Sequence, residues 1–271
     1  MSGSTDDLNS RLEAACDMAR DAGNLTLDFF RGETTSFERK ADDTPVTEAD
    51  RQAEQLMRKV IEKSFPRDAI VGEEFGQQSG NSGYRWILDP IDGTKSFISG
   101  VPLYGTLIGL EKEGRSIVGV IYIPALGELL YAATGCGAWY CNGGAPAQAA
   151  RVSTCEALRD GLFVTSEIES FHQRDVVPVF RELQRRAYIT RTWGDCYGYL
   201  LVATGRAEVM IDPAMSVWDA AALQPIMEEA GGTFTDWKGT PTIFHGEGIG
   251  TNRLVLDEVL SITRPAAEAA S

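Results

Sequence analysis

The chain has 271 residues, 43% of them hydrophobic and 24% charged, and a formal net charge of −14. This length fits one large domain or two closely packed halves, and the composition is that of a globular protein rather than a disordered or membrane-spanning one. The acidic surface excludes general binding to nucleic acid or to anionic membranes.

Helices are predicted in the N-terminal part of the chain. The opening residues, MSGSTDDLNSR, lack the basic flank and apolar core of a secretory signal, so we expect a cytoplasmic protein. Apolar side chains at helical spacing predict an amphipathic helix over residues 8–31, ended by Gly32. A second helix is predicted over 48–63, with Thr47 as its N-cap and Pro66 beyond its end.

Strands follow, and the pattern then changes. Short apolar runs predict strands at 69–72, 85–88, 104–110 and 117–123, with a hairpin turn at Glu113 and Gly114. From about residue 151, predicted strands (162–165, 188–192, 208–211) alternate with predicted helices (170–187, 196–204, 217–230). We therefore expect an N-terminal α+β half over 1–150 and a C-terminal α/β half over 151–271, packed as one compact unit, with residues 265–271 as a loose tail.

The segment WILDPIDGTK, residues 86–95, carries the clearest chemical signal. A strand delivers Asp89 and Asp92 onto a turn, and Mg²⁺ prefers such carboxylate oxygens as ligands. Gly93 permits close approach of the backbone, and a helix beginning at Thr94 would offer N–H groups to a phosphate. The same pattern also occurs in surface turns that bind no metal, so other segments of the sequence are needed to distinguish a metal site from a surface turn.

Three segments together resemble the inositol monophosphatase family over nearly the whole chain. They are VGEEFG at 71–76, WILDPIDGTKSFISGVPLYG at 86–105, and WDAAA at 218–222 followed by EEAGG at 228–232. The resemblance implies an α/β (α+β) layered sandwich with alternating helix and sheet layers. It also implies a Mg²⁺-dependent phosphomonoesterase whose active site lies between the two halves.

The family's metal ligands transfer to particular positions here. The first ion would be held by Glu73, Asp89 and the backbone carbonyl of Ile91, and the second by Asp89, Asp92 and Asp219. Taken alone, Glu73 could be a solvated turn residue, and Asp219 could only stabilise a helix N-terminus. Two supporting residues are expected outside the ligand set, namely Glu74 and Lys40.

The resemblance extends to residues 40–50, which in the family contribute to a third, weaker ion and to activation of water. Asp50 is the residue that transfers, with Thr94 as its partner: the Thr94 hydroxyl would orient the attacking water. A helix-capping role for Thr47 or Asp50 is the alternative. Two or three Mg²⁺ ions are therefore expected, and Mn²⁺ accepts the same ligands.

The implied chemistry needs no protein nucleophile. Two ions about 3.5–4 Å apart neutralise the phosphate dianion, activate water and stabilise the leaving oxygen. The sequence agrees, because no G-x-S-x-G motif appears and neither His172 nor His245 lies in a matched segment. The five cysteines suggest neither a disulfide framework nor a zinc site.

The substrate's alcohol is a separate question, since the family includes phosphatases for several small phosphorylated metabolites. The segments RTWGDCYGY at 191–199 and VMIDP at 209–213 resemble the histidinol-phosphate phosphatase branch. Histidinol phosphate carries an ammonium and an imidazole, so Asp195 and Asp212 would favour it unless each only caps a helix or closes a turn. Phosphate itself is expected to contact Asp92, Gly93, Thr94 and Asp219.

Two other functions are alternatives to a histidinol-phosphate phosphatase. Inositol 1-phosphate is the alternative substrate, although the family's inositol phosphatases characteristically have glutamate where this chain has Asp212. A noncatalytic phosphate-sensing protein would be expected to lack a metal carboxylate, and none is missing. Because relatives are commonly dimers, the resemblance also implies a homodimer.

Overall fold

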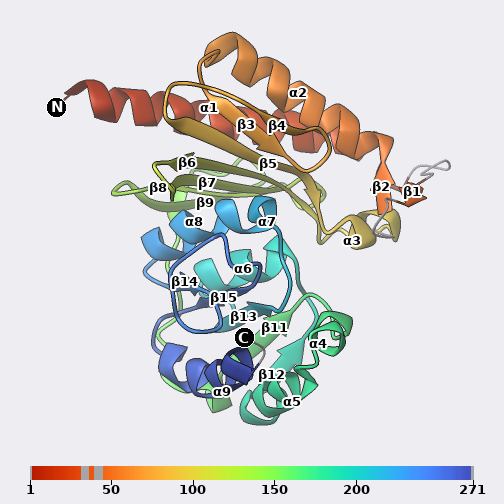
Figure 1. Ribbon diagram of the computed structural model, residues 1–271, viewed down its shortest axis with the longest axis vertical. Coiled ribbons are helices and arrows are strands. Elements are labelled where there is room, and N and C mark those ends of the chain that lie inside the picture. Colours follow the sequence, from red (N-terminus) through yellow and green to blue (C-terminus); the bar gives the residue numbers. More distant parts are fainter. Residues whose placement is uncertain (1, 32–36, 40–44, 270–271) are drawn as a thin grey trace.

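Layers of helix and sheet alternate along the long axis of the molecule (Figure 1). The computed structural model describes residues 2–31, 37–39 and 45–269. From the N-terminal end, the layers are a helix pair, a first sheet, a middle group of short helices, a second sheet and a last group of helices (Figure 1). The predicted layered α/β fold is confirmed.

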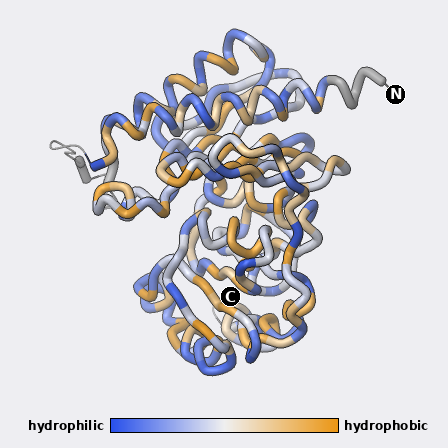
Figure 2. The backbone as a smooth tube through the Cα atoms, turned by 180° about the vertical axis from the view of Figure 1, so that it is seen from behind, coloured by the Kyte–Doolittle hydropathy of each residue, from blue (hydrophilic) through white to orange (hydrophobic). Residues whose placement is uncertain are grey.

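The first layer consists of α1 (Ser2–Leu27) and α2 (Glu48–Ser64). Along both helices, hydrophilic and hydrophobic residues recur within each turn, as expected for helices with one buried side (Figure 2). A buried ion pair joins α1 to the segment before the first sheet, with Arg11 Nε 3.0 Å from Asp68 Oδ2. The first helix ends at Leu27 rather than at the predicted residue 31, and the short strands β1 (Phe37–Arg39) and β2 (Pro45–Thr47) pair before α2.

The first sheet brings the metal-binding segment to the middle of the molecule. Its strand order is β10 (Gln148–Ala149), β9 (Gly137–Asn142), β8 (Glu128–Ala133), β7 (Arg115–Ile123), β6 (Gly105–Lys112), β5 (Tyr84–Asp92), β3 (Ala69–Gly72) and β4 (Gly76–Gln78). The predicted hairpin is confirmed, because β6 and β7 pair antiparallel and both turn residues have positive φ, 53° at Glu113 and 82° at Gly114. The sequence patterns had not indicated β4, β8, β9 or β10.

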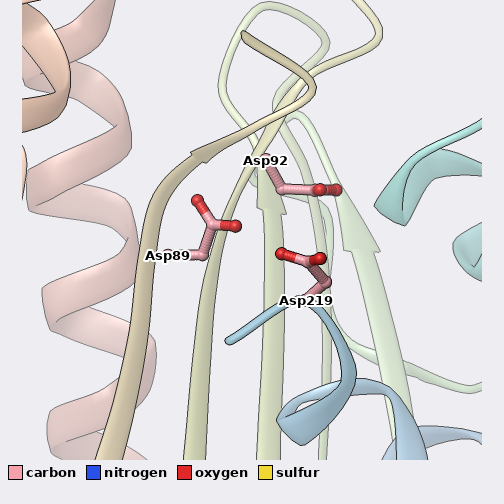
Figure 3. A group of neighbouring side chains, drawn as sticks. All are labelled: Asp89, Asp92 and Asp219. Carbon is pink, nitrogen blue, oxygen red and sulfur yellow. The ribbon is translucent and has the colours of Figure 1, made fainter. Parts of the chain in front are cut away.

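Short helices fill the space between the two sheets: α6 (Cys196–Ala203), α7 (Val217–Ala221) and α8 (Leu223–Glu229). The prediction of one helix over 217–230 is wrong, because a turn at Ala222 interrupts the helix. Pro225 has no N–H to pair with the carbonyl of Ala221, which accepts the Ser116 hydroxyl at 2.6 Å instead. This break leaves α7 as a separate turn whose start faces the end of β5 (Figure 3).

The second sheet and the last helices complete the fold. The strand order is β12 (Ile189–Arg191), β11 (Leu162–Thr165), β13 (Val209–Asp212), β15 (Gly248–Thr251) and β14 (Thr233–Thr235), after the 3₁₀ turn η1 (Leu158–Asp160). The predicted helix 170–187 is two helices, α4 (Glu169–Gln173) and α5 (Val177–Arg186). Asp175 has φ 56° between them and Pro178 starts the second, which explains the break.

The C-terminal residues differ most from the sequence-based expectation. Residues 265–269 belong to α9 (Leu256–Ala269) and are not a loose tail. Ala267 is buried, and the Thr263 hydroxyl one turn earlier donates to the carbonyl of Trp237 at 2.9 Å, so tertiary contacts hold this low-complexity segment in a helix. Within the described chain, no helix is long and apolar enough to cross a membrane.

Candidate active site

A cavity of about 640 Å³ opens where the first sheet, α7 and the second sheet meet. Its lining is strongly acidic, with six carboxylates and one lysine: Glu73, Asp92, Glu167, Asp195, Asp212, Asp219 and Lys95. Neutral groups complete the wall, among them Thr94, Ser166 and the first residues of α6 and α7. Such an acidic cavity needs bound cations before it can accept a phosphate.

Three of the predicted metal ligands lie together, two of them in the cavity lining and Asp89 buried behind it. Asp89 and Asp92 come from the end of β5, and Asp219 comes from the first turn of α7. One carboxylate oxygen from each lies within 4.8 Å of the others, and the three side chains point toward one another (Figure 3). The chain thus brings together residues that lie up to 130 positions apart in sequence.

Local backbone geometry explains why these side chains converge. The pairing of β5 with β6 shifts register between Asp89 and Asp92, so the strand end is irregular. The N–H of Ile91 donates to Asp89 Oδ1 at 3.1 Å, and Gly93, at φ 85°, then turns the chain into α3 (Thr94–Ile98), the predicted helix start. Glycine is suited to this left-handed conformation, which a side chain would strain.

Hydrogen bonds fix the other two carboxylates. The backbone N–H of Cys196, at the start of α6, donates to Asp92 Oδ2. The backbone N–H of Ser216 donates to Asp219 Oδ2 at 2.6 Å, so Asp219 also completes a capping box. The two interpretations of Asp219 from sequence are therefore compatible, because one carboxylate can cap α7 and still face the cluster.

The electrostatics of this cluster favour a bound cation. Burial, and then the negative charge of Glu73 and Asp92, raise the pKa of Asp89 well above its usual value. Burial and the charges of Asp195 and Asp219 do the same to the pKa of Asp92, and burial raises the pKa of Asp219 to about 7. Oxygen ligands held this close, with mutual repulsion to relieve, fit a hard divalent ion.

Glu73 lies on the segment between β3 and β4, at the same cavity. Its N–H donates to the carbonyl of Leu88 at 3.2 Å, and its negative charge contributes to the raised pKa of both Asp89 and Asp219. The structure therefore places Glu73 beside the cluster, as the predicted first-ion site requires. The Ile91 carbonyl accepts the Thr94 hydroxyl at 3.1 Å, and its role as a metal ligand stays a prediction.

Asp50 and Thr94 each have another hydrogen-bond partner, and their joint role in activating water stays a prediction. Asp50 is buried, and its Oδ2 accepts the Thr47 N–H at 2.7 Å and the Thr47 hydroxyl at 2.6 Å. Because this capping box occupies Asp50, and Thr94 donates to Ile91, the hydrogen bonds of these described residues do not join Asp50 to Thr94. Burial raises the pKa of Asp50 to about 7, with smaller contributions from the nearby charges of Glu74 and Glu73. Lys40 lies outside the described residues.

Asp195 and Asp212 lie in one hydrogen-bonded group beside the cluster, and a Cβ added at Gly93 would lie 2.9 Å from Asp195 Oδ2. The Ser166 hydroxyl donates to Asp212 Oδ1 at 2.6 Å and accepts the backbone N–H of Asp195 at 2.8 Å. Burial raises the pKa of Asp195 to about 6 and that of Asp212 to about 7. The sequence analysis did not single out Ser166, which connects these two residues.

The whole-chain comparison decides the family. A model described as the inositol monophosphatase family matches residues 7–267. The chain belongs to the inositol monophosphatase family. The chain is 48% identical over 238 residues to a histidinol-phosphatase from Chlorobaculum parvum. The aligned region covers 88% of this chain and 90% of that protein. The chain is also 39% identical over 247 residues to a histidinol-phosphatase from Streptomyces coelicolor, covering 90% and 92%.

The structural comparison agrees with the family assignment. The solved structure of an IMPase from Thermotoga maritima superposes with a TM-score of 0.84 at 29% identity, covering 97% of this chain and all of that one. The layered fold of this chain is thus the fold of the family, and the similarity extends over nearly its full length.

Glu54 is a supporting residue that the sequence analysis missed. This fully buried glutamate of α2 accepts the backbone N–H groups of Glu74, at 2.7 Å, and Phe75, at 3.2 Å. An added Cβ at Gly72 would lie 2.0 Å from Glu54 Oε1, so the strand end and this carboxylate are closely packed. Glu54 therefore fixes the segment that carries Glu73 on the cavity wall.

Replacing Glu54 with glutamine is expected to lower phosphatase activity by about 10-fold. The weaker hydrogen bonds to the segment after Glu73 would let the Glu73 carboxylate move from its position at the metal site. The neighbouring exposed Glu62 on the same helix provides a matched control, and Glu62→Gln should leave the rate unchanged. Initial rates at increasing Mg²⁺ concentrations measure the effect, which should include weaker apparent Mg²⁺ affinity. Equal rates for the two variants would show that Glu54 does not support Glu73.

Proposed function

We propose that this protein is a Mg²⁺-dependent phosphatase that hydrolyses histidinol phosphate to histidinol and phosphate. The observation that carries the proposal is that the carboxylate cluster and the group formed by Asp195, Ser166 and Asp212 lie side by side at one cavity. The relatives named histidinol-phosphatase, at 48% and 39% identity, support the choice of substrate.

The metal-binding part of the proposal assigns named groups to the ions. Glu73, Asp89 and the carbonyl of Ile91 would hold one Mg²⁺, and Asp89, Asp92 and Asp219 a second, with Mn²⁺ able to replace either. When bound, such ions neutralise the phosphate dianion and make water a better nucleophile at neutral pH. The high pKa values of these carboxylates mean that ion binding displaces protons from the cluster.

The protein's own groups orient the substrate around that centre. Gly93 and Thr94 would contact the phosphate with Asp92 and Asp219, all of which line the cavity. The Thr94 hydroxyl is held by the Ile91 carbonyl and would orient the attacking water beside Glu73. Asp50 would contribute to activation of the water, and Glu74 and Lys40 would support the loop segments around the first ion.

The alcohol end of the substrate would lie against Asp195 and Asp212. Burial favours the protonated form of both carboxylic acids, and a substrate cation beside them would favour the ionised form. A neutral polyol offers no such compensation for the buried charge. This difference supports histidinol phosphate over inositol 1-phosphate. A homodimer, which rests on the family resemblance, and a cytoplasmic location complete the proposal.

Metal removal tests the reaction class. Phosphate release from histidinol phosphate is expected with Mg²⁺, should fall by at least about 100-fold in EDTA and should return when Mg²⁺ is added in excess. Mn²⁺ is expected to restore part of the rate. A noncatalytic phosphate-sensing protein would release no phosphate with either ion, and that result would reject the proposal.

A further inference from the structure

An ion pair crosses the cavity between its two walls. Lys95, in α3 beside the first sheet, places Nζ 2.9 Å from Glu167 Oε1 and 2.8 Å from Oε2. Glu167 follows β11 of the second sheet, and both residues line the cavity. Among the lining residues that the structure describes, Lys95 is the one cationic side chain. The pair therefore joins the phosphate side of the cavity to the alcohol side.

Another cation can replace Lys95 at Glu167 at little cost in stability. Its side chains are 66% and 41% exposed, and exposed ion pairs of this kind contribute little net stability. Asp212, by contrast, is buried and hydrogen-bonded to Ser166. Glu167 is thus a carboxylate of the alcohol side that another cation can reach without breaking a buried hydrogen bond.

The backbone of Glu167 is fixed while its side chain remains accessible. The Ser170 hydroxyl donates to the Glu167 carbonyl at 3.0 Å, and the preceding Ser166 bonds the N–H of Asp195. The pair also lies within electrostatic reach of Asp195, whose pKa is raised by the charge of Glu167 and lowered by that of Lys95. Glu167 therefore borders the site proposed for the alcohol.

We propose that Glu167 is a specificity-determining residue that binds the ammonium group of the substrate, and that Lys95 occupies this position in the free protein. The inference rests on the proposed function and adds a residue to it. Histidinol phosphate has a primary ammonium on the carbon next to the CH₂–O–phosphate group, so a cation site beside the phosphate centre suits it. The lysine ammonium is the same chemical group.

Exchange of one ammonium for another lets a cationic alcohol bind without leaving a carboxylate unpaired. A substrate ammonium can replace Lys95 at Glu167, because the carboxylate keeps one cationic partner throughout. An ester with a neutral alcohol has no group to offer and leaves the Lys95–Glu167 pair intact. Specificity would then come from the ion pair between the substrate's ammonium group and Glu167.

The decisive experiment compares two esters that differ only in the ammonium group. They are histidinol phosphate and 3-(imidazol-4-yl)propyl phosphate, which lacks it. Glu167→Gln is expected to raise KM for histidinol phosphate by about 3-fold or more, the scale of one exposed ion pair, with kcat changed by less than about 2-fold, and to leave both constants for the desamino ester unchanged. Lys95→Gln removes the competitor and is expected to lower KM for histidinol phosphate.

Glu169→Gln is the matched control, since it removes an exposed carboxylate two residues away in α4, outside the cavity lining. It should change neither ester's constants, and all variants should unfold at the wild-type temperature. An unchanged KM in Glu167→Gln, or an equal loss with both esters, would overturn the inference while wild-type turnover of histidinol phosphate upholds the proposed function. A wild-type protein inactive on histidinol phosphate would overturn both.

Discussion

Replacement of Asp92 by asparagine is expected to lower kcat by about 1000-fold or more, equivalent to about 4 kcal/mol of transition-state stabilisation. Asparagine keeps the shape of the side chain, and its carbonyl oxygen can still accept the N–H of Cys196. The change removes one negative charge from the cluster and with it a metal ligand. Initial rates at saturating Mg²⁺ measure the loss.

The same variant makes a second, opposite prediction for stability. Because Asp92 is held among like charges, Asp92→Asn should make the metal-free protein more resistant to thermal unfolding, not less. Asp17→Asn is the control, since its side chain is 77% exposed on α1 and it should alter neither property. Activity of Asp92→Asn within threefold of wild type would contradict the assigned site.

Removal of divalent ions is expected to make stability fall as the pH rises from about 4 to about 7. The pKa values in the folded state, about 6 for Asp195 and about 7 for Asp212 and Asp219, lie above the ordinary value of 3.8. The folded state therefore binds protons more tightly than the unfolded state in this window. By linkage, the free energy of unfolding declines through it.

Mg²⁺ should oppose this decline by compensating the repulsion between ionised carboxylates. At about 100 times its dissociation constant, an ion adds about 2.7 kcal/mol, or roughly 5 °C or more in Tm for a chain of this size. Thermal unfolding at pH 5.5 and 7.5, in EDTA and in Mg²⁺, gives the comparison. The increment from Mg²⁺ should be larger at pH 7.5. Equal increments at both pH values would contradict a metal site built on these carboxylates.

Local sequence signals predicted most of the fold where periodicity and turn residues agreed. The helix after Thr47, the strand ending at Asp92 and the turn at Glu113 and Gly114 were all confirmed. The failures have local or tertiary causes. Pro178 and Pro225 each interrupted a pattern that looked like one continuous helix, and packing of Ala267 maintained a helix in a segment that composition alone suggested was loose.

Some residues of the candidate site could be predicted from the sequence and others could not. Motif spacing and family resemblance identified Asp89, Asp92 and Asp219, which the structure brings together. Glu54 was missed because a helical glutamate ordinarily faces solvent, and its role depends on backbone N–H groups 20 and 21 residues away. Lys95 and Glu167 lie 72 residues apart, so no local pattern could pair them. The division at residue 150 and the supporting roles of Glu74 and Lys40 stay predictions.

We propose that the acidic residues Asp195, Asp212 and Glu167 select a cationic alcohol while the carboxylate cluster holds the metal. The most direct test is the ratio of kcat/KM for histidinol phosphate to that for inositol 1-phosphate at saturating Mg²⁺. We expect histidinol phosphate to be favoured by about 10-fold or more, the scale on which one charged contact discriminates. An equal or higher kcat/KM for inositol 1-phosphate would contradict the claim.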